Sequence, residues 1–341
     1  MNTSTILAAF ATLFFFQATA QDLQADNMLL FQRASGGWSK QFKKKALDYN
    51  QQFSAEDKIQ IALEAKGRDA NIDNGSTAKE IRYLLATYKK VKNPQYLSAA
   101  ENGIRFLLKA QYENGGWPQY YPEQNLYRAQ ITYNDNAMIN ALNVLQDVVR
   151  KQNDLEIVNP ELIAPAEKAI KKGIDCILKT QIKVNGVLTA WCQQYDEKTM
   201  LPAKARSYEL PSISGSESVK IVEFLMSQPN PSSEIKASVS AAIDWFNKAK
   251  ISGYKIVDVP APGTPKGKNR EVTADPAAAI WARFYEIETN RPFFCDRDGI
   301  KKYDIKEITY DARNGYSWYG EWPKNLLEKE YPKWLKTVKS L

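Results

Sequence analysis

The 341-residue chain contains no histidine. Histidine is the usual proton-transfer group near neutral pH, so its absence leaves two possibilities. Either the protein carries out no proton chemistry, or a less common side chain does so. The stretch PAKARSYELPSISGSES, which begins at Pro202, offers Arg206 and Glu209 as the first candidates.

Cysteine is scarce: the chain has Cys176, Cys192 and Cys295, and no C-x-x-C pair. This spacing argues against a structural zinc site. Export would permit one disulfide and one remaining thiol, but the sequence does not indicate which two residues would pair.

Long apolar runs are absent except at residues 6–16, which precede the A-x-A cleavage pattern Ala18-Thr19-Ala20. This run is too short to span a bilayer comfortably, and no Lys or Arg precedes it. We predict that residues 1–20 form a signal peptide cleaved after Ala20, so that the mature chain, residues 21–341, is secreted or periplasmic. No later segment predicts a membrane helix, and we expect no membrane partner.

Aromatic residues and positive charge are plentiful: the chain has 8 Trp, 18 Tyr and a formal net charge of +7. Aromatic side chains beside Gly, Asn and Gln suit sugar rings, although a place in the core is the more common alternative for any single tryptophan. The charge is compatible with an anionic polymer, and equally with a solvated basic surface. Without a basic helix or a recognised module, we expect no nucleic-acid partner.

Apolar residues recur at helical spacing along most of the chain. The pattern predicts a mainly α-helical protein with long irregular loops and few short strands, and with helices near residues 81–91, 97–110, 138–149, 163–177, 219–226, 235–249, 276–288 and 323–338. The Pro- and Gly-rich residues 258–270 predict an exposed loop between the helical body and a C-terminal part that begins near residue 271.

A weak internal repeat is visible in LLFQRASGGWSKQF, LLKAQYENGGWPQYY and ILKTQIKVNGVLTAWCQQY. Each stretch runs from an apolar helix end through a glycine (Gly36, Gly115 or Gly186) to Trp and Gln. The spacing leaves room for one helical hairpin per repeat, which predicts a partial α/α toroid of such hairpins. Coincidence of common turn signals is the alternative.

Two helix starts carry the S/T-x-x-E pattern of a capping box, Thr77 with Glu80 and Ser214 with Glu217. A third predicted helix opens at Asp135-Asn136.

Polar residues precede each of these helix starts: Asp73-Asn74, Asp135, and Arg206 with Glu209. If the helices are neighbouring hairpins of one toroid, their N-terminal ends bring these residues to one surface. Aspartate and asparagine oxygens are hard ligands that suit calcium, although helix capping explains either aspartate alone.

The chain resembles the pectate lyases of polysaccharide lyase family ten. The resemblance runs in family order from about residue 30 to residue 322, on the motifs DNGST, NGGWPQYYP, TYNDNAM, TAWCQQYD, AKARSYELPS, WARFYEI and NRPFFCDRDG. It implies an α-helical partial toroid and a calcium-dependent, endo-acting lyase on polygalacturonate, which we expect to be a monomer.

The resemblance also implies roles for single residues. Arg206 matches the proton-abstracting arginine of the family, and Asp73 and Asp135 match its calcium-side carboxylates, with Asn74 beside the first. Where the family often has a histidine after WCQQ, this chain has Tyr195, so that histidine is not essential here.

Substrate-binding residues follow from the same motifs. Arg283 and Arg297 match arginines that grip uronate carboxylates in neighbouring subsites. We also expect Asn74, Tyr208 and Trp117 to contact the substrate.

The implied chemistry is β-elimination, which removes the weakly acidic C5 proton beside the uronate carboxylate. Calcium and arginines on that carboxylate would stabilise the negative charge that develops. Arginine is normally protonated, so nearby cations are expected to lower the pKa of Arg206, and an alkaline optimum is predicted. Two alternatives are an α/α-toroid glycoside hydrolase that uses Asp135 and Glu209, and a non-catalytic uronate-binding protein.

Overall fold

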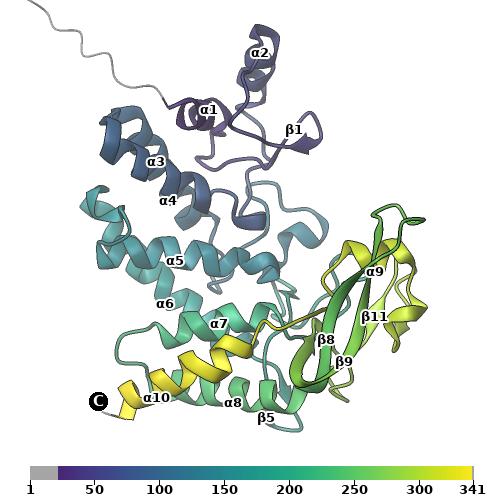
Figure 1. Cartoon of the computed structure of the whole chain (residues 1–341). Helices are drawn as coiled ribbons and strands as arrows, with labels where there is room; N and C mark the ends of the chain where they lie inside the picture. Colours follow the sequence, from purple (N-terminus) through teal and green to yellow (C-terminus); the bar gives the residue numbers. More distant parts are fainter. Residues whose placement is uncertain (1–21, 340–341) are drawn as a thin grey trace, which may run out of the picture.

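The computed structural model describes residues 22–339, so the predicted signal peptide lies outside the described residues. The architecture is mainly helical, as predicted. Consecutive helices pack in pairs, α3 with α4, α5 with α6 and α7 with α8, and Figure 1 displays these pairs stacked one after another, as in a partial toroid. The helices are α1 (Leu23–Phe31), α2 (Ala55–Glu64), α3 (Ala78–Val91), α4 (Pro94–Ala110), α5 (Ala137–Arg150), α6 (Ile163–Thr180), α7 (Glu217–Met226), α8 (Ser233–Ala249), α9 (Tyr310–Gly315) and α10 (Tyr331–Lys339).

Local capping explains where several helices begin. Asn93 accepts a hydrogen bond from the backbone of Gln95, and Pro94 supplies the first residue of α4. Ser232 caps α8 in the same way through the backbone of Ile235. Every predicted helix is observed except the one near residues 276–288; the last begins with a π-helical turn, Leu326–Glu330, that continues into α10.

Strands are short except in one hairpin. The strands are β1 (Gln41–Phe42), β2 (Lys45–Ala46), β3 (Ile131–Thr132), β4 (Lys183–Val184), β5 (Val187–Leu188), β6 (Gln194–Tyr195), β7 (Ile213–Ser214), β8 (Ile251–Pro260), β9 (Lys268–Ala282), β10 (Phe284–Tyr285), β11 (Phe294–Cys295), β12 (Lys301–Lys302) and β13 (Tyr319–Gly320). The antiparallel strands β8 and β9 form a three-stranded sheet in the order β13-β9-β8. In Figure 1 this hairpin stands beside the helical stack, next to α9 and β11.

The predicted repeat is present as a repeated set of hydrogen bonds. A glutamine directly after a helix donates to the carbonyl at the following turn and to a carbonyl of a later helix: Gln32 to Gly36 and Ala99, and Gln111 to Gly115 and Ala169. These bonds tie α1 to α4 and α4 to α6.

Gly186 is not the third equivalent glycine. Gln181 donates instead to Thr189 and to Ser238 of α8, because the β4–β5 hairpin lengthens this turn. Gly186 lies in that hairpin with φ +80°, and an added Cβ would meet nothing within 4 Å.

A buried tryptophan closes each turn. The indole N–H groups of Trp38 and Trp117 donate to carbonyls ten residues earlier, at Met28 and Leu107. Trp191 donates to Ile177, and Trp281 donates to Phe246 across a separation of 35 residues. The bond from Trp281 therefore adds a fourth repeat to the three that the sequence predicted. In this fourth repeat, the β8–β9 hairpin is inserted between the helix end and the tryptophan.

This insertion explains two corrections. Residues 276–288 are strand rather than helix, because they carry the end of β9, Trp281 and β10. Residues 258–270 are exposed or half-buried, but both ends of this segment are paired: Asp258, Val259 and Pro260 face Arg270, Asn269 and Lys268 across the hairpin. Only the turn between the strands is irregular.

The core follows the helical stack, and a smaller cluster of Phe284, Phe293, Phe294, Cys295, Ile308 and Trp318 supports the C-terminal part. Cys176, Cys192 and Cys295 are all buried and free, so no disulfide joins them. No helix within residues 22–339 is long and apolar enough to cross a bilayer.

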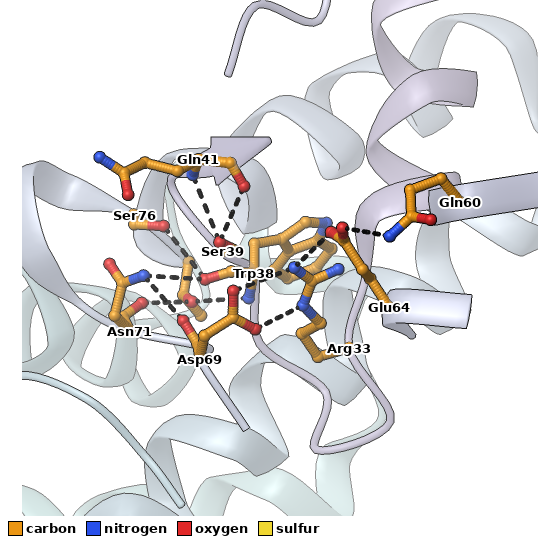
Figure 2. A network of polar contacts seen from close by, with 10 residues as sticks. Arg33, Trp38, Ser39, Gln41, Gln60, Glu64, Asp69, Asn71 and Ser76 are labelled. Atoms are coloured by element: carbon orange, nitrogen blue, oxygen red, sulfur yellow. Dashed lines mark hydrogen bonds and ion pairs between the residues drawn. The ribbon is translucent and has the colours of Figure 1, made fainter. Parts of the chain in front are cut away.

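A polar network holds the segment that precedes α3 (Figure 2). Buried Arg33 binds both carboxylate oxygens of Asp69, at 2.7 and 3.0 Å. The side-chain amide of Asn71 donates to the carbonyls of Asp69 and Trp38, and its oxygen accepts the backbone N–H of Asp73. Asn71 thus links the backbone of Asp73 to the repeated Trp38, and this link positions Asp73.

We predict that Gly115→Ala lowers the free energy of unfolding by about 3 kcal/mol, because its φ is +91° and a Cβ would lie 2.0 Å from the carbonyl oxygen of Lys172 in α6. Gly186→Ala is the matched control: it has a positive φ but open space around the Cβ, so the loss should be about 1 kcal/mol. Urea unfolding measures both, and equal losses would mean that the close approach of the turn to α6 contributes nothing.

Candidate active site

The three polar turns predicted to converge do so. They line a pocket of about 100 Å³, called here the Arg206 pocket, whose residues are Lys40, Asp73, Asn74, Gln119, Tyr120, Tyr127, Asn134, Asp135, Gln194, Arg206 and Glu209. Asp73, Asn74, Asp135 and Arg206 thus share one site, as the helix starts indicated.

Asp73 and Asn74 lie in the tight turn Asp73–Gly75 ahead of α3. Asn74 has φ +50°, a left-handed conformation that asparagine tolerates better than most residues. The predicted capping box of Thr77 and Glu80 is wrong. The Thr77 hydroxyl donates to the carbonyl of Asn71, and Glu80 accepts from buried Tyr49.

Asp135 occupies the same kind of turn ahead of α5, within Asn134–Asn136, with φ +51°. The side-chain amide of Asn134 donates to its carboxylate at 2.8 Å, and Arg283 lies 3.7 Å away. Burial raises the pKa of the Asp135 carboxyl, and the negative charge of Glu217 raises it further against the opposing effect of Arg283.

Lys40 is a member of the pocket that the sequence reasoning missed. Its ammonium group forms an ion pair with the buried carboxylate of Asp73. Burial lowers the pKa of Lys40, and the charge of Arg206 adds to this effect while Asp135 opposes it. The lysine therefore neutralises Asp73 in the structure.

Arg206 is held by Glu209, whose carboxylate accepts from the backbone N–H, Nε and Nη2 of the arginine. Nη1 has no hydrogen-bond partner within residues 22–339. Burial acts to lower the pKa of Arg206, but the bonds and charge of Glu209 outweigh it, and the pKa is raised. The expected lowering by nearby cations is therefore wrong for the site without substrate.

Arg283 is buried and already has partners. It forms an ion pair with Glu217, the first residue of α7, and its guanidinium lies 4.7 Å from the centre of the Tyr316 ring. Ser214 donates to the other oxygen of Glu217 and accepts the backbone N–H of Glu217. The predicted capping box is thus half formed. Ser214 accepts the backbone N–H of Glu217, but the Glu217 side chain binds Arg283 and does not return to the backbone of Ser214.

Arg297 and Tyr208 lie outside the Arg206 pocket. They line a neighbouring cavity of about 390 Å³ with Tyr316 and Trp318. Tyr316 joins the two sites: its hydroxyl donates to Glu209, and the Arg206 guanidinium lies 5.9 Å from its ring centre. The Arg206 guanidinium also lies 4.9 Å from the ring centre of Tyr208, so the cavity that contains Arg297 adjoins the Arg206 pocket.

Trp117 is a correction. It is 0% exposed, and its indole is consumed by the bond to Leu107, so it belongs to the core and does not reach a substrate. Tyr195 is buried as well, and its hydroxyl accepts the backbone N–H of Cys192. The tyrosine that stands in place of the family histidine is structural.

The oxygens of the pocket fit a hard cation. Asp73 Oδ1 and Asn134 Oδ1 are buried without any hydrogen-bond partner, which leaves lone pairs unsatisfied beside Asp135. The described part of the chain contains no cluster of three or more His, Cys, Asp or Glu that could hold a metal by itself. A cation here would need further ligands from elsewhere.

Three of the missed residues follow a repeated tryptophan by two or three positions. Lys40 and Gln119 come two residues after Trp38 and Trp117, and Gln194 comes three residues after Trp191. The repeated tryptophan was therefore a signal for the site as well as for the fold.

Comparison with known proteins identifies similar chains. Residues 32–327 match the family model described as pectic acid lyase. A family 10 polysaccharide lyase from Cellvibrio cellulosa superimposes with a TM-score of 0.77 at 35% identity, over 93% of this chain and 92% of the other. A substituted form of a family 10 polysaccharide lyase from that organism, in complex with trigalacturonic acid, gives a TM-score of 0.78 at 36% identity, over 91% and 92%.

No curated protein matches the chain. The family match covers most of the chain, and the solved structures exceed 30% identity across almost all of it. The chain belongs to the pectic acid lyase family, the polysaccharide lyases of family 10.

Proposed function

We propose that the protein is a secreted, calcium-dependent pectate lyase that cleaves polygalacturonate by β-elimination, with Arg206 as the proton acceptor. The observation that carries the proposal is the meeting of Arg206 with Asp73 and Asp135 in one pocket. Supporting it, a relative 36% identical is a polysaccharide lyase in complex with trigalacturonic acid. Residues 1–20 would direct export.

The reaction needs a base and a means of offsetting charge on the uronate carboxylate. Calcium, when bound, would act as a Lewis acid that withdraws negative charge from that carboxylate. Asp73, Asp135 and Asn134 are the residues that would hold it, since two of them carry unpartnered buried oxygens. Lys40, now paired with Asp73, would then be free to pair with substrate.

In this proposal the neutral form of Arg206 accepts the proton through Nη1, the nitrogen without a hydrogen-bond partner among the described residues. Glu209 fixes Nε and Nη2 and so sets the plane of the guanidinium. Because Glu209 also raises the pKa of Arg206, the neutral form is rare at neutral pH, and the rate should rise into the alkaline range. Calcium that binds together with the substrate would lower the pKa of Arg206 and so counter the effect of Glu209.

The two alternatives are less well supported. A hydrolase would use Glu209 as acid or base, but both of its oxygens are bound by Arg206. A protein that only binds uronates would not need the Nη1 nitrogen of Arg206 to lack a hydrogen-bond partner while Glu209 holds the rest of the guanidinium. It would bind polygalacturonate without releasing an ultraviolet-absorbing unsaturated product.

We predict that Arg206→Ala lowers the lyase rate about 10²- to 10⁴-fold while substrate binding is retained, because a general base is lost. Arg206→Lys should keep a fraction of the rate, with the alkaline limb at lower pH, since the ordinary pKa of lysine lies about three units below that of arginine. Release of the unsaturated uronide, followed by absorbance, measures both. Arg105→Ala, on an exposed face of α4, is the control; full activity of Arg206→Ala would exclude the mechanism.

A chelator should abolish activity, and added calcium should restore it. We predict that Asp73→Asn and Asp135→Asn raise the calcium concentration for half-maximal rate about tenfold or more, because each removes a charged ligand. Asp244→Asn, at an exposed position of α8, should leave it unchanged. Calorimetric titration of calcium in the presence of trigalacturonate gives a second readout. Wild-type activity that survives the chelator would remove the metal from the proposal.

Glu217→Gln should shift the acid limb of the pH–rate profile to lower pH. Asp135 must be ionised to hold a cation, and Glu217 helps to keep its pKa above the ordinary value, so activity is lost as pH falls through that raised pKa. Removing the charge of Glu217 lowers the pKa of Asp135. Glu223→Gln, on the exposed side of α7, is the control, and an acid limb that stays in place would contradict the assignment.

A further inference from the structure

A second groove, distinct from the Arg206 pocket, lies along the β8–β9 hairpin. Its volume is about 890 Å³, and its walls come from β8, β9, β13, α9 and the segment around the short helix η6 (Ile305–Glu307). None of its lining residues lines the Arg206 pocket. The groove exists because the hairpin is inserted in the fourth turn of the repeat.

Exposed tyrosines form part of its lining. Tyr254 on β8 is 45% exposed, and its hydroxyl has no hydrogen-bond partner within residues 22–339. Tyr303 is 40% exposed and is fixed by Glu286, which accepts from its hydroxyl, and by the Arg291 guanidinium, 3.6 Å from its ring centre. Exposed aromatic rings of this kind suit the C–H faces of sugar rings.

The groove also holds cations that have no carboxylate partner. Lys306 forms no ion pair with any described residue, and the Arg313 guanidinium donates only to the amide oxygen of Asn269 and the carbonyl of Ile308. Two carboxylates also line the groove: Asp304 caps η6, and Glu271 accepts from the amide of Asn269. Lys306 and Arg313 are the lining cations without a carboxylate partner among the described residues, and they can pair with an anionic group of a ligand.

We propose that this groove binds a second stretch of acidic polysaccharide, with Tyr254 stacking on a sugar ring and Lys306 and Arg313 pairing with uronate carboxylates. The inference rests on the proposed function, since polygalacturonate is the polymer that carries both features. A chain held at two places dissociates more slowly than a chain held at one, because release of one contact leaves the other engaged. The groove would thus favour polymer over short oligomers.

The test compares polygalacturonate with trigalacturonate as substrates of the full chain. Tyr254→Ala combined with Lys306→Ala should raise KM for the polymer about five- to tenfold, leave kcat unchanged, and leave both constants for trigalacturonate unchanged. Tyr254→Phe, which keeps the ring, and Lys248→Ala, on exposed α8, are the controls and should resemble wild type. Equal melting temperatures exclude unfolding as the cause.

A binding measurement separates the groove from catalysis. In gels that contain polygalacturonate, Arg206→Ala should still be retarded, and the groove substitutions added to it should reduce that retardation; neutral galactan should retard neither. Unchanged polymer KM and retardation in the groove variant, or equal losses on trigalacturonate, would overturn the inference. Failure of wild type to cleave polygalacturonate at all would instead contradict the proposed function.

Discussion

The hydrogen bond from a buried indole to the end of a helix is the interaction on which the rest of the structure depends. Trp38, Trp117, Trp191 and Trp281 each donate to the fourth-last residue of the preceding helix. A carbonyl at that position lacks a backbone N–H partner within its own helix, and a buried indole N–H needs an acceptor, so one bond serves both. It fixes where the chain turns back, and with it the residues that follow each tryptophan. Residues of the Arg206 pocket that follow these tryptophans are thereby positioned by contacts in the core.

The charges of the site are balanced internally before substrate arrives. Lys40 pairs with Asp73, and Arg283 lies between Glu217 and Asp135. Arg206 pairs with Glu209. Isolated buried charges are costly, and such pairing offsets that cost in the pocket. In the proposed function, binding of a uronate would be an exchange of partners, in which an incoming carboxylate and cation replace contacts that the protein already makes. Such an exchange would avoid the full desolvation of any one charge.

The sequence predicted the helices and the convergence of Asp73, Asp135 and Arg206, because helical periodicity is local and a repeat implies stacking. It failed where a tertiary contact overrode a local pattern. Residues 276–288 are rich in alanine, a strong helix former, yet Trp281, which bonds to Phe246, lies near the end of strand β9. Thr77 has a capping pattern, but its hydroxyl is recruited by the carbonyl of Asn71. Lys40 has no local signal beyond its distance from Trp38, so its pairing with Asp73 appears only when two distant turns meet.

Trp117 is one of several aromatic residues whose burial follows from their hydrogen bonds. The four repeated tryptophans are buried, and each donates its indole N–H to a carbonyl at a helix end, whereas Tyr254 and Tyr303 are exposed along the groove. An indole has a single donor, and once a helix carbonyl takes it the ring must stay in the core. A phenol can bury part of its ring while its hydroxyl stays in water or bonds at the surface. In this fold the tryptophans therefore build the turns, and contact with a polymer falls to the tyrosines and to the cations beside them.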